Sequence, residues 1–198
     1  MPAIRTDGDP RRLEAFLPRR DRHYLAVTAA VALGGGAVLL AAAPSAWLWP
    51  ALAGFALCSA LIGAGDAVTQ RIPNLLNLTA LCSAVPLLAL AVGGRSGSPA
   101  GAVSGAAAAF AVYFGLWLVA PSGMGLGDVK LAPYLGAHLG LFGLSCWWHG
   151  MFYGVAVQGV VVAIGLAAGR LRRGDRLAHG PAMCLGAAAA LLEALLTH

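Results

Sequence analysis

The sequence predicts an all-α fold, a bundle of helices that crosses a membrane about six or seven times, and two observations support this prediction. First, 59% of the 198 residues are hydrophobic and only 11% are charged, whereas a soluble domain needs more charged residues to cover its surface. Second, seven apolar runs come near the roughly 20 residues that a membrane-spanning helix needs. The runs cover residues 24–43, 48–65, 75–92, 101–120, 129–147, 151–169 and 182–197.

The basic residues predict the orientation of these runs. Six Arg lie in residues 1–23 and four in residues 170–176, and Arg71 and Lys130 fall on the same side if the runs alternate. Only Arg95 is then left on the other side. Because Lys and Arg accumulate on the cytoplasmic side of membrane proteins, we expect a basic cytoplasmic tail over residues 1–23 and a membrane domain over residues 24–198. The net charge of +5 then reflects topology, and we expect no nucleic-acid partner.

The small residues within the runs point to packing and not to chemistry. Cys58, Cys82, Cys146 and Cys184 stand singly, without any C-x-x-C pair, so they predict neither a zinc site nor a disulfide framework. Gly and Ala are abundant, for example in residues 101–110, and in lipid such residues let helix backbones approach closely.

Two acidic residues stand apart from this background. Asp66 closes the second run, just before Pro73 and Asn74, which break the helix and begin the next run. Asp128 follows the glycines of the stretch GMGLGDVKL, which begins at Gly123. The predicted alternation brings both aspartates to the cytoplasmic ends of their helices.

The Gly-rich stretch matches no familiar ligand-binding loop. A phosphate loop has Lys directly after its last Gly, whereas Asp128 and Val129 intervene here, and a dinucleotide fingerprint would need a Gly at position 128. A metal site would need further ligands, and only His138 is near in sequence, so we expect no metal and no organic cofactor. Two carboxylates at one membrane depth are what an aspartic protease requires, one ionised to activate water and one protonated to polarise the peptide carbonyl. The alternative is that each Asp caps a helix or pairs with a base.

Three motifs carry a resemblance to a known family. Residues 125–130 read G-x-G-D-x-K, which resembles the signature of the GxGD membrane aspartyl proteases. Residues 66–74 read D-x4-R-I-P-N, which is similar to the first aspartate motif of type IV prepilin peptidases, and residues 179–186 resemble the Gly-Pro segment that opens the family's last helix. Besides the aspartates, the matched residues are Gly125, Gly127, Lys130, Pro73, Asn74, Gly180 and Pro181.

The resemblance, which covers roughly residue 48 to the C-terminus, implies a peptidase of the bacterial cytoplasmic (inner) membrane with Asp66 and Asp128 as its catalytic dyad. Its substrates would be prepilin-like or pseudopilin-like precursors, cut at the cytoplasmic face, and its further partners would be membrane lipid and a pilus or secretion machinery. Many family members also carry a cytoplasmic domain with paired cysteines and methylate the new N-terminus. The sequence lacks that domain, so it resembles the shorter peptidases of tight-adherence (Flp) pilus systems.

Two other classes of function stay open at this point. Intramembrane carboxylates also relay protons or bind cations in a small transporter component, although no chain of polar residues continues across the predicted bilayer. A non-catalytic scaffold would keep the helices without needing both aspartates. Within the peptidase hypothesis, Asp66 at a helix C-terminus is expected to keep the shared proton, and Asp128 at a helix N-terminus is expected to be ionised.

Overall fold

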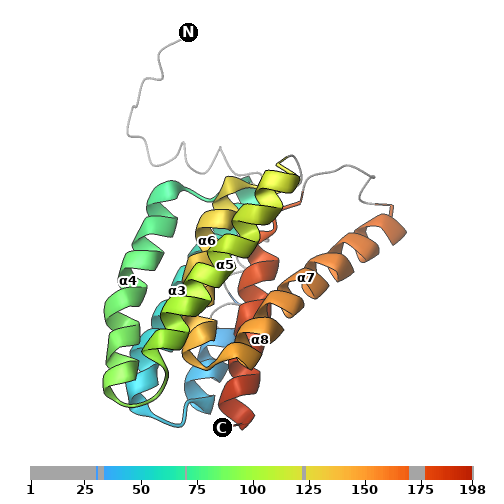
Figure 1. Cartoon of the computed structure of the whole chain (residues 1–198). Coiled ribbons are helices and arrows are strands. Elements are labelled where there is room, and N and C mark those ends of the chain that lie inside the picture. The colour runs from blue at the N-terminus through green and yellow to red at the C-terminus, as the bar shows by residue number, and fades with distance from the viewer. Residues whose placement is uncertain (1–29, 31–33, 70, 122–123, 170–176, 198) are drawn as a thin grey trace, which may run out of the picture.

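The computed structural model describes residues 30, 34–69, 71–121, 124–169 and 177–197, and this part of the chain is helical, with no strand in it. A short 3-10 helix, η1 (Ala46–Leu48), leads into α3 (Trp49–Thr69), and residues 34–42 are also helical. The remaining helices are α4 (Asn74–Gly93), α5 (Pro99–Val119), α6 (Leu126–Leu141), α7 (Leu144–Ala167) and α8 (Gly180–Thr197). They form a bundle from which one end of α7 diverges (Figure 1). The predicted all-α bundle is confirmed.

Five helices are long and apolar enough to cross a membrane, counting only the described residues. Large apolar side chains cover their outer faces, as expected for helices in contact with lipid; they include Leu75, Val85, Val103, Val119 and Leu144. The protein is therefore a multi-pass membrane protein. Residues 24–29 and 31–33 of the predicted run 24–43 and the whole predicted tail 1–23 lie outside the described residues.

The predicted span over residues 129–147 is wrong. Helix α6 ends at Leu141 and α7 begins at Leu144, because Gly143 turns the chain with a φ of 107°, a conformation that favours glycine. Helix α6 has 16 residues, of which 12 are buried. It is therefore a short central helix enclosed by the others, and it carries Asp128 in its first turn.

The predicted close packing of small residues is seen where α6 meets α5. A Cβ atom added to Gly101 would overlap the carbonyl oxygen of Gly140, and one added to Gly105 would overlap that of Gly136. The two backbones are therefore in contact along antiparallel helices. The contact moves four residues forward on α5 for every four residues backward on α6. Trp147 of α7 stabilises this contact, because its Nε1 donates a hydrogen bond of 2.9 Å to the carbonyl of Gly105.

The starts of two helices follow from local sequence. Pro73 directly precedes the first residue of α4, as predicted, with an extended ψ of 134°, and a proline disfavours helix in the residue before it. Ser98 caps α5 by accepting a hydrogen bond of 3.0 Å from the backbone N–H of Gly101, and Pro99 occupies the first helical position, where no N–H is needed.

Candidate active site

Asp66 lies near the end of α3 and is buried, with 5% of its surface exposed. Its Oδ2 atom accepts a hydrogen bond of 3.0 Å from the backbone N–H of Gly180, the first residue of α8. A Cβ atom on Gly180 would lie 2.8 Å from this oxygen, closer than van der Waals contact allows. Glycine at position 180 therefore lets the helix terminus meet the carboxylate.

Asp128 lies in the first turn of α6 and is equally buried, with 6% exposed. Its Oδ2 accepts a hydrogen bond of 3.3 Å from the N–H of Gly125, the residue that precedes the helix. Gly127, the residue before Asp128, and Gly180, which donates to Asp66, both pack against Ile72, so the two aspartates lie in one region of the fold. The alternative reading, that each Asp caps a helix, thus describes part of the geometry, because Asp128 caps α6 and Asp66 caps α8. Capping alone does not require both carboxylates in one place.

Ile72, which belongs to the first sequence motif, packs against a glycine of each of the other two motifs. A Cβ atom on Gly127 would lie 3.1 Å from the Cβ of Ile72, and one on Gly180 would lie 3.2 Å from its Cδ1. Ile72 itself is 8% exposed. It therefore packs between the segment of Asp128 and the segment that holds Asp66. Sequence reasoning missed this role, although Ile72 stands inside the motif that was recognised.

The glycines before Asp128 differ in what they face. Gly127 is in contact with Ile72, so protein and not substrate occupies the space beside it. Within the part of the chain that the structure describes, a Cβ atom on Gly125 would meet the Asp128 carboxylate and the N atom of Gly127, at 3.4 and 3.8 Å, and Gly125 is exposed. Among these residues Gly125 therefore leaves space beside the Asp128 carboxylate. Gly123 lies outside the described residues.

The other predicted motif residues with side chains are more exposed than the two aspartates. Lys130 Nζ donates a hydrogen bond of 2.7 Å to Asn74 Oδ1, and both side chains are exposed. Pro73 is exposed, and Pro181 is half-buried in the first turn of α8. Asn77, one turn beyond Asn74, is buried and donates a hydrogen bond of 3.0 Å to the carbonyl of Gly127. Helix α4 is thus tied twice to the start of α6.

The expectation that Asp66 keeps the shared proton depended on a difference between the helix termini at the two aspartates. It assumed that Asp66 is near only a helix C-terminus, whereas Asp66 also accepts the first N–H of α8. Both carboxylates therefore lie at a helix N-terminus, where exposed N–H groups favour a negative charge. At Asp66 the N-terminus of α8 therefore opposes the effect of the C-terminus of α3, and helix termini alone do not assign the proton.

The described residues contain no group of three or more His, Cys, Asp or Glu side chains placed to hold a metal ion. The chemistry that the arrangement offers is that of the two carboxylates themselves. A buried pair of interacting carboxyl groups tends to share one proton, which leaves one base and one acid side by side.

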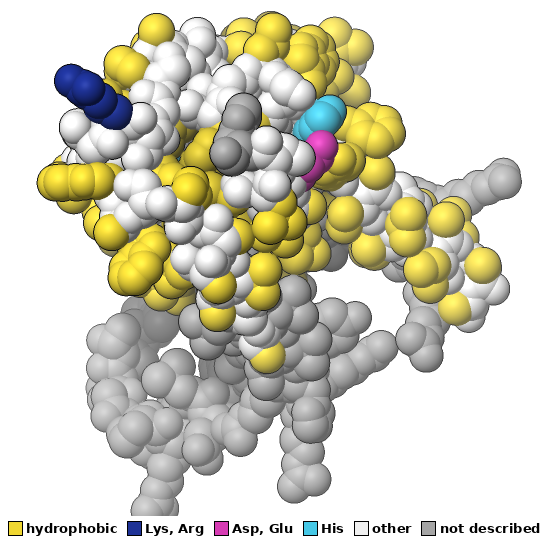
Figure 2. Space-filling view, turned by 90° about the horizontal axis from the view of Figure 1, so that it is seen from below, with side chains coloured by type: hydrophobic (Ala, Val, Ile, Leu, Met, Phe, Trp, Pro, Cys, Tyr) yellow, Lys and Arg dark blue, Asp and Glu magenta, His cyan; other side chains and the backbone are white. Residues whose placement is uncertain are grey.

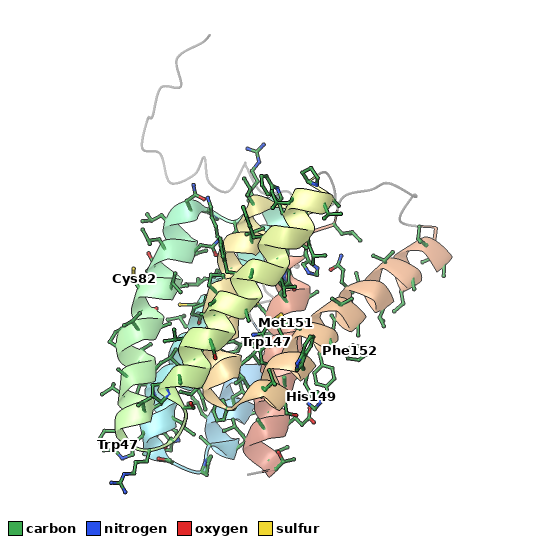
Figure 3. The ribbon with its side chains drawn as sticks, viewed as in Figure 1. Trp47, Cys82, Trp147, His149, Met151 and Phe152 are labelled. Carbon is green, nitrogen blue, oxygen red and sulfur yellow. The ribbon has the colours of Figure 1, made fainter. Side chains whose placement is uncertain are left out.

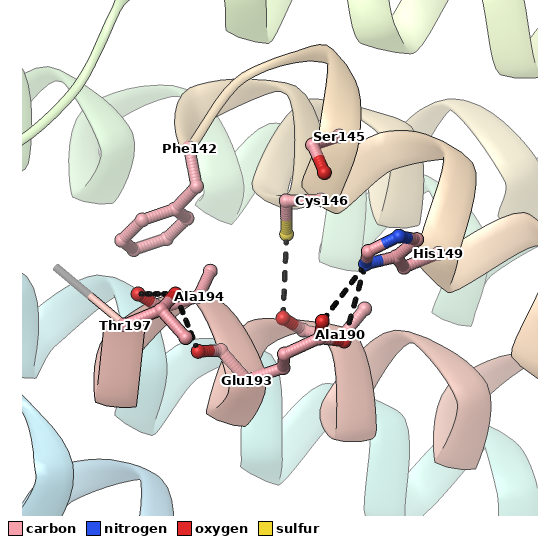
Figure 4. Close-up of a pocket in the computed structure, with 8 residues that line it drawn as sticks. All are labelled: Phe142, Ser145, Cys146, His149, Ala190, Glu193, Ala194 and Thr197. Carbon is pink, nitrogen blue, oxygen red and sulfur yellow. Dashed lines mark hydrogen bonds and ion pairs between the residues drawn. The ribbon is translucent and has the colours of Figure 1, made fainter.

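A second polar cluster lies at the other end of the bundle, as seen from that end in Figure 2, where a histidine adjoins an acidic side chain. His149 Nδ1 of α7 lies 3.1 Å from Glu193 of α8, and the Tyr153 hydroxyl donates a hydrogen bond of 2.7 Å to Glu193 Oε2. Figure 3 shows His149 near the end of α7 that approaches α8. Figure 4 shows the small pocket beside it, lined by Phe142, Ser145, Cys146, His149, Ala190, Glu193, Ala194 and Thr197.

Comparison with known proteins agrees with the motifs. Residues 52–191 match the type IV leader peptidase family. Two curated proteins described as "Prepilin leader peptidase/N-methyltransferase", from strains 1026b and K96243 of Burkholderia pseudomallei, are each 35% identical to this chain over 181 residues. Each match covers 86% of this chain and 54% of the relative, so the chain spans about half the length of these relatives. No solved structure matches the chain.

Proposed function

Because this chain belongs to the type IV leader peptidase family, we propose that it is a membrane-embedded aspartic endopeptidase that removes the leader peptides of type IV prepilin-like or pseudopilin-like precursors. The family predicted from the three motifs is confirmed, and it is a family of peptidases. The observation that carries the proposal is that Ile72 packs against both Gly127, the residue before Asp128, and Gly180, whose N–H donates to Asp66, so two buried carboxylates from helices far apart in sequence lie in one region.

In the proposed reaction one carboxylate is ionised and takes a proton from a water molecule, while the other is protonated and donates a hydrogen bond to the scissile carbonyl. The water oxygen adds to the carbonyl carbon, and the tetrahedral intermediate then breaks at its C–N bond. The leaving amine receives the proton that the first carboxylate took from water, which returns that carboxylate to its ionised form. The open side of the dyad at Gly125 supports an approach of the substrate backbone from that direction.

The location of the reaction rests on charge. The concentration of Lys and Arg on one side of the predicted topology supports a cytoplasmic N-terminus and cleavage at the cytoplasmic face of the bacterial inner membrane. Prepilin-like precursors are the proposed substrates because both relatives are described as prepilin leader peptidases. A pilus or secretion machinery and the surrounding lipid are the proposed partners. Membership of a peptidase family favours this function over the transporter alternative.

The direct test is to incubate membranes that contain the protein with a candidate prepilin and to follow release of the leader by mass spectrometry. We expect Asp66→Asn and Asp128→Asn each to lower the cleavage rate by at least about 10²–10⁴-fold, because a positioned acid or base contributes that much. Membrane insertion and the melting temperature of each variant are measured alongside as controls. Cleavage at the wild-type rate by either variant would remove the dyad from the mechanism.

A further inference from the structure

Tyr113 of α5 lies opposite Asp128, and helix register shows why. Gly101 and Gly105 of α5 touch Gly140 and Gly136 of α6, as described above. Eight residues beyond Gly105 on the same face is Tyr113, and eight residues before Gly136 is Asp128. Tyr113 is 4% exposed and belongs to the buried face of α5, together with Gly105 and Ala109. The close backbone contact between α5 and α6 therefore places the phenol of Tyr113 at the level of Asp128.

Tyr113 also reaches the segment that holds Asp66. Its ring centroid is 6.1 Å from that of His179, with the ring planes tilted by 35°. His179 directly precedes Gly180, whose N–H donates to Asp66. Burial lowers the pKa of His179, so its ring is neutral near pH 7 and packs on Tyr113 as an uncharged aromatic group. Tyr113 therefore lies beside the segment whose N–H donates to Asp66, and helix register places it at the level of Asp128.

The hydroxyl of Tyr113 differs from those of the other described tyrosines. The Tyr134 hydroxyl donates a hydrogen bond of 3.2 Å to the carbonyl of Gly54, and the Tyr153 hydroxyl donates one of 2.7 Å to Glu193. The Tyr113 hydroxyl has no hydrogen-bond partner within the ranges of the chain that the structure describes. A buried phenol normally finds a partner. The Tyr113 donor is thus available at the place where substrate would bind.

We propose that Tyr113 is a third catalytic group of the active site, whose hydroxyl donates a hydrogen bond to the carbonyl oxygen of the scissile peptide bond. This inference rests on the proposed peptidase function. Tyr113 keeps its proton throughout, while the aspartates carry out the proton transfers. As water adds, the carbonyl oxygen gains negative charge, and a donor already aimed at it stabilises that charge more than it stabilises the substrate.

The test is Tyr113→Phe, which removes the hydroxyl and keeps the ring that packs on His179. The kcat and KM for prepilin cleavage are measured for wild type and variant. We expect kcat to fall about 10²-fold, the loss typical of one donor to a developing oxyanion. We expect KM to change less than about threefold, because the hydrogen bond is strongest in the transition state. A kcat within about threefold of wild type would overturn the inference.

Two matched variants separate catalysis from packing. Tyr134→Phe and Tyr153→Phe remove hydroxyl groups bound to Gly54 and Glu193, away from the dyad. Both are expected to keep the wild-type kcat. If Tyr113→Phe melts at a lower temperature than Tyr134→Phe and the two lose cleavage in parallel, Tyr113 has a structural role and the inference is wrong.

The same experiment separates this inference from the function on which it rests. If the wild-type protein cleaves the precursor and the Asp66→Asn variant does not, the peptidase function stands whatever Tyr113→Phe shows. If the wild-type protein cleaves no precursor, the proposed function fails first. A peptide whose scissile carbonyl is replaced by a tetrahedral hydroxyl carbon supplies a readout besides turnover. Tyr113→Phe should bind this mimic at least about tenfold more weakly and bind the uncleaved precursor as wild type does.

Discussion

Each end of the helical bundle holds carboxylates that lie near α8, but their exposure and their hydrogen-bond donors differ between the two ends. At the dyad end, Asp66 and Asp128 are 5% and 6% exposed, and backbone N–H groups of Gly180 and Gly125 donate to them. At the other end, the Glu193 side chain is 39% exposed and receives hydrogen bonds from the side chains of His149 and Tyr153. Thirteen residues of helix, about 20 Å, separate Gly180 from Glu193.

This difference in exposure and in hydrogen-bond donors distinguishes a carboxylate that stabilises a helix contact from a pair proposed to take part in catalysis. A half-exposed carboxylate with a histidine and a phenol beside it costs little to keep and joins α7 to α8. Two buried carboxyl groups whose charges interact cost free energy unless they share a proton, and perturbed groups of this kind gather at functional sites. In the proposed function the dyad end carries the chemistry, whereas the Glu193 end holds a contact between α7 and α8.

Apart from substitution of the aspartates themselves, the largest effect is expected from Gly180→Ala at the dyad end. The new Cβ would lie 2.8 Å from Asp66 Oδ2 and 3.2 Å from Ile72 Cδ1, so the carboxylate must move. A shift of about 1 Å in a reacting group costs roughly 10²-fold in rate, and we expect the cleavage rate to fall by that amount.

The matched control is Gly65→Ala, because a Cβ at Gly65, the residue before Asp66, would meet no described residue within 4 Å. This variant should cleave as the wild type does. Equal loss of activity in both variants would show that the contact between α8 and Asp66 has no special importance for cleavage.

The sequence allowed prediction of the features that depend on local composition. Five of the predicted runs correspond to helices within the described residues, and Pro73 precedes α4 as predicted. The boundary between α6 and α7 was missed because average hydropathy does not detect Gly143, whose positive φ ends an apolar run that continues on both sides. The buried character of α6 is likewise set by its neighbours and not by its own sequence.

The candidate site was predicted in part. Asp66 and Asp128 were found because acids are rare in apolar runs, and the structure brings them together. Tyr113 and Ile72 were missed because each reaches the site through contacts between distant segments: the glycine register of α5 on α6 for Tyr113, and the spaces left beside Gly127 and Gly180 for Ile72. Such long-range register has no signature in a single sequence.

An intermediate effect is expected at Lys130, which belongs to the G-x-G-D-x-K motif but lies on the exposed rim of the dyad end. Its Nζ donates to Asn74 Oδ1, and both side chains are exposed, so solvent screens the interaction. We expect Lys130→Gln to change the cleavage rate by less than about fivefold, the equivalent of 0–1 kcal/mol. A loss comparable to that of Asp128→Asn, at unchanged protein level in the membrane, would move Lys130 from the rim into the catalytic machinery.

The smallest effect is expected from Glu193→Gln, which tests the comparison from the structural side. The substitution keeps the shape of the side chain and removes the charge that faces His149, at a site where 44% of the His149 side chain and 39% of the Glu193 side chain are exposed. An exposed pair of this kind contributes about 0–1 kcal/mol, so the melting temperature should change only slightly. Cleavage should stay at the wild-type rate, because the cluster lies on the last turns of α8, far from Gly180. The measurement is a prepilin cleavage assay beside a thermal melt in detergent. If Glu193→Gln abolished cleavage while the melting temperature held, the two ends of the bundle would be functionally coupled, and a carboxylate at the Glu193 end could no longer be called structural.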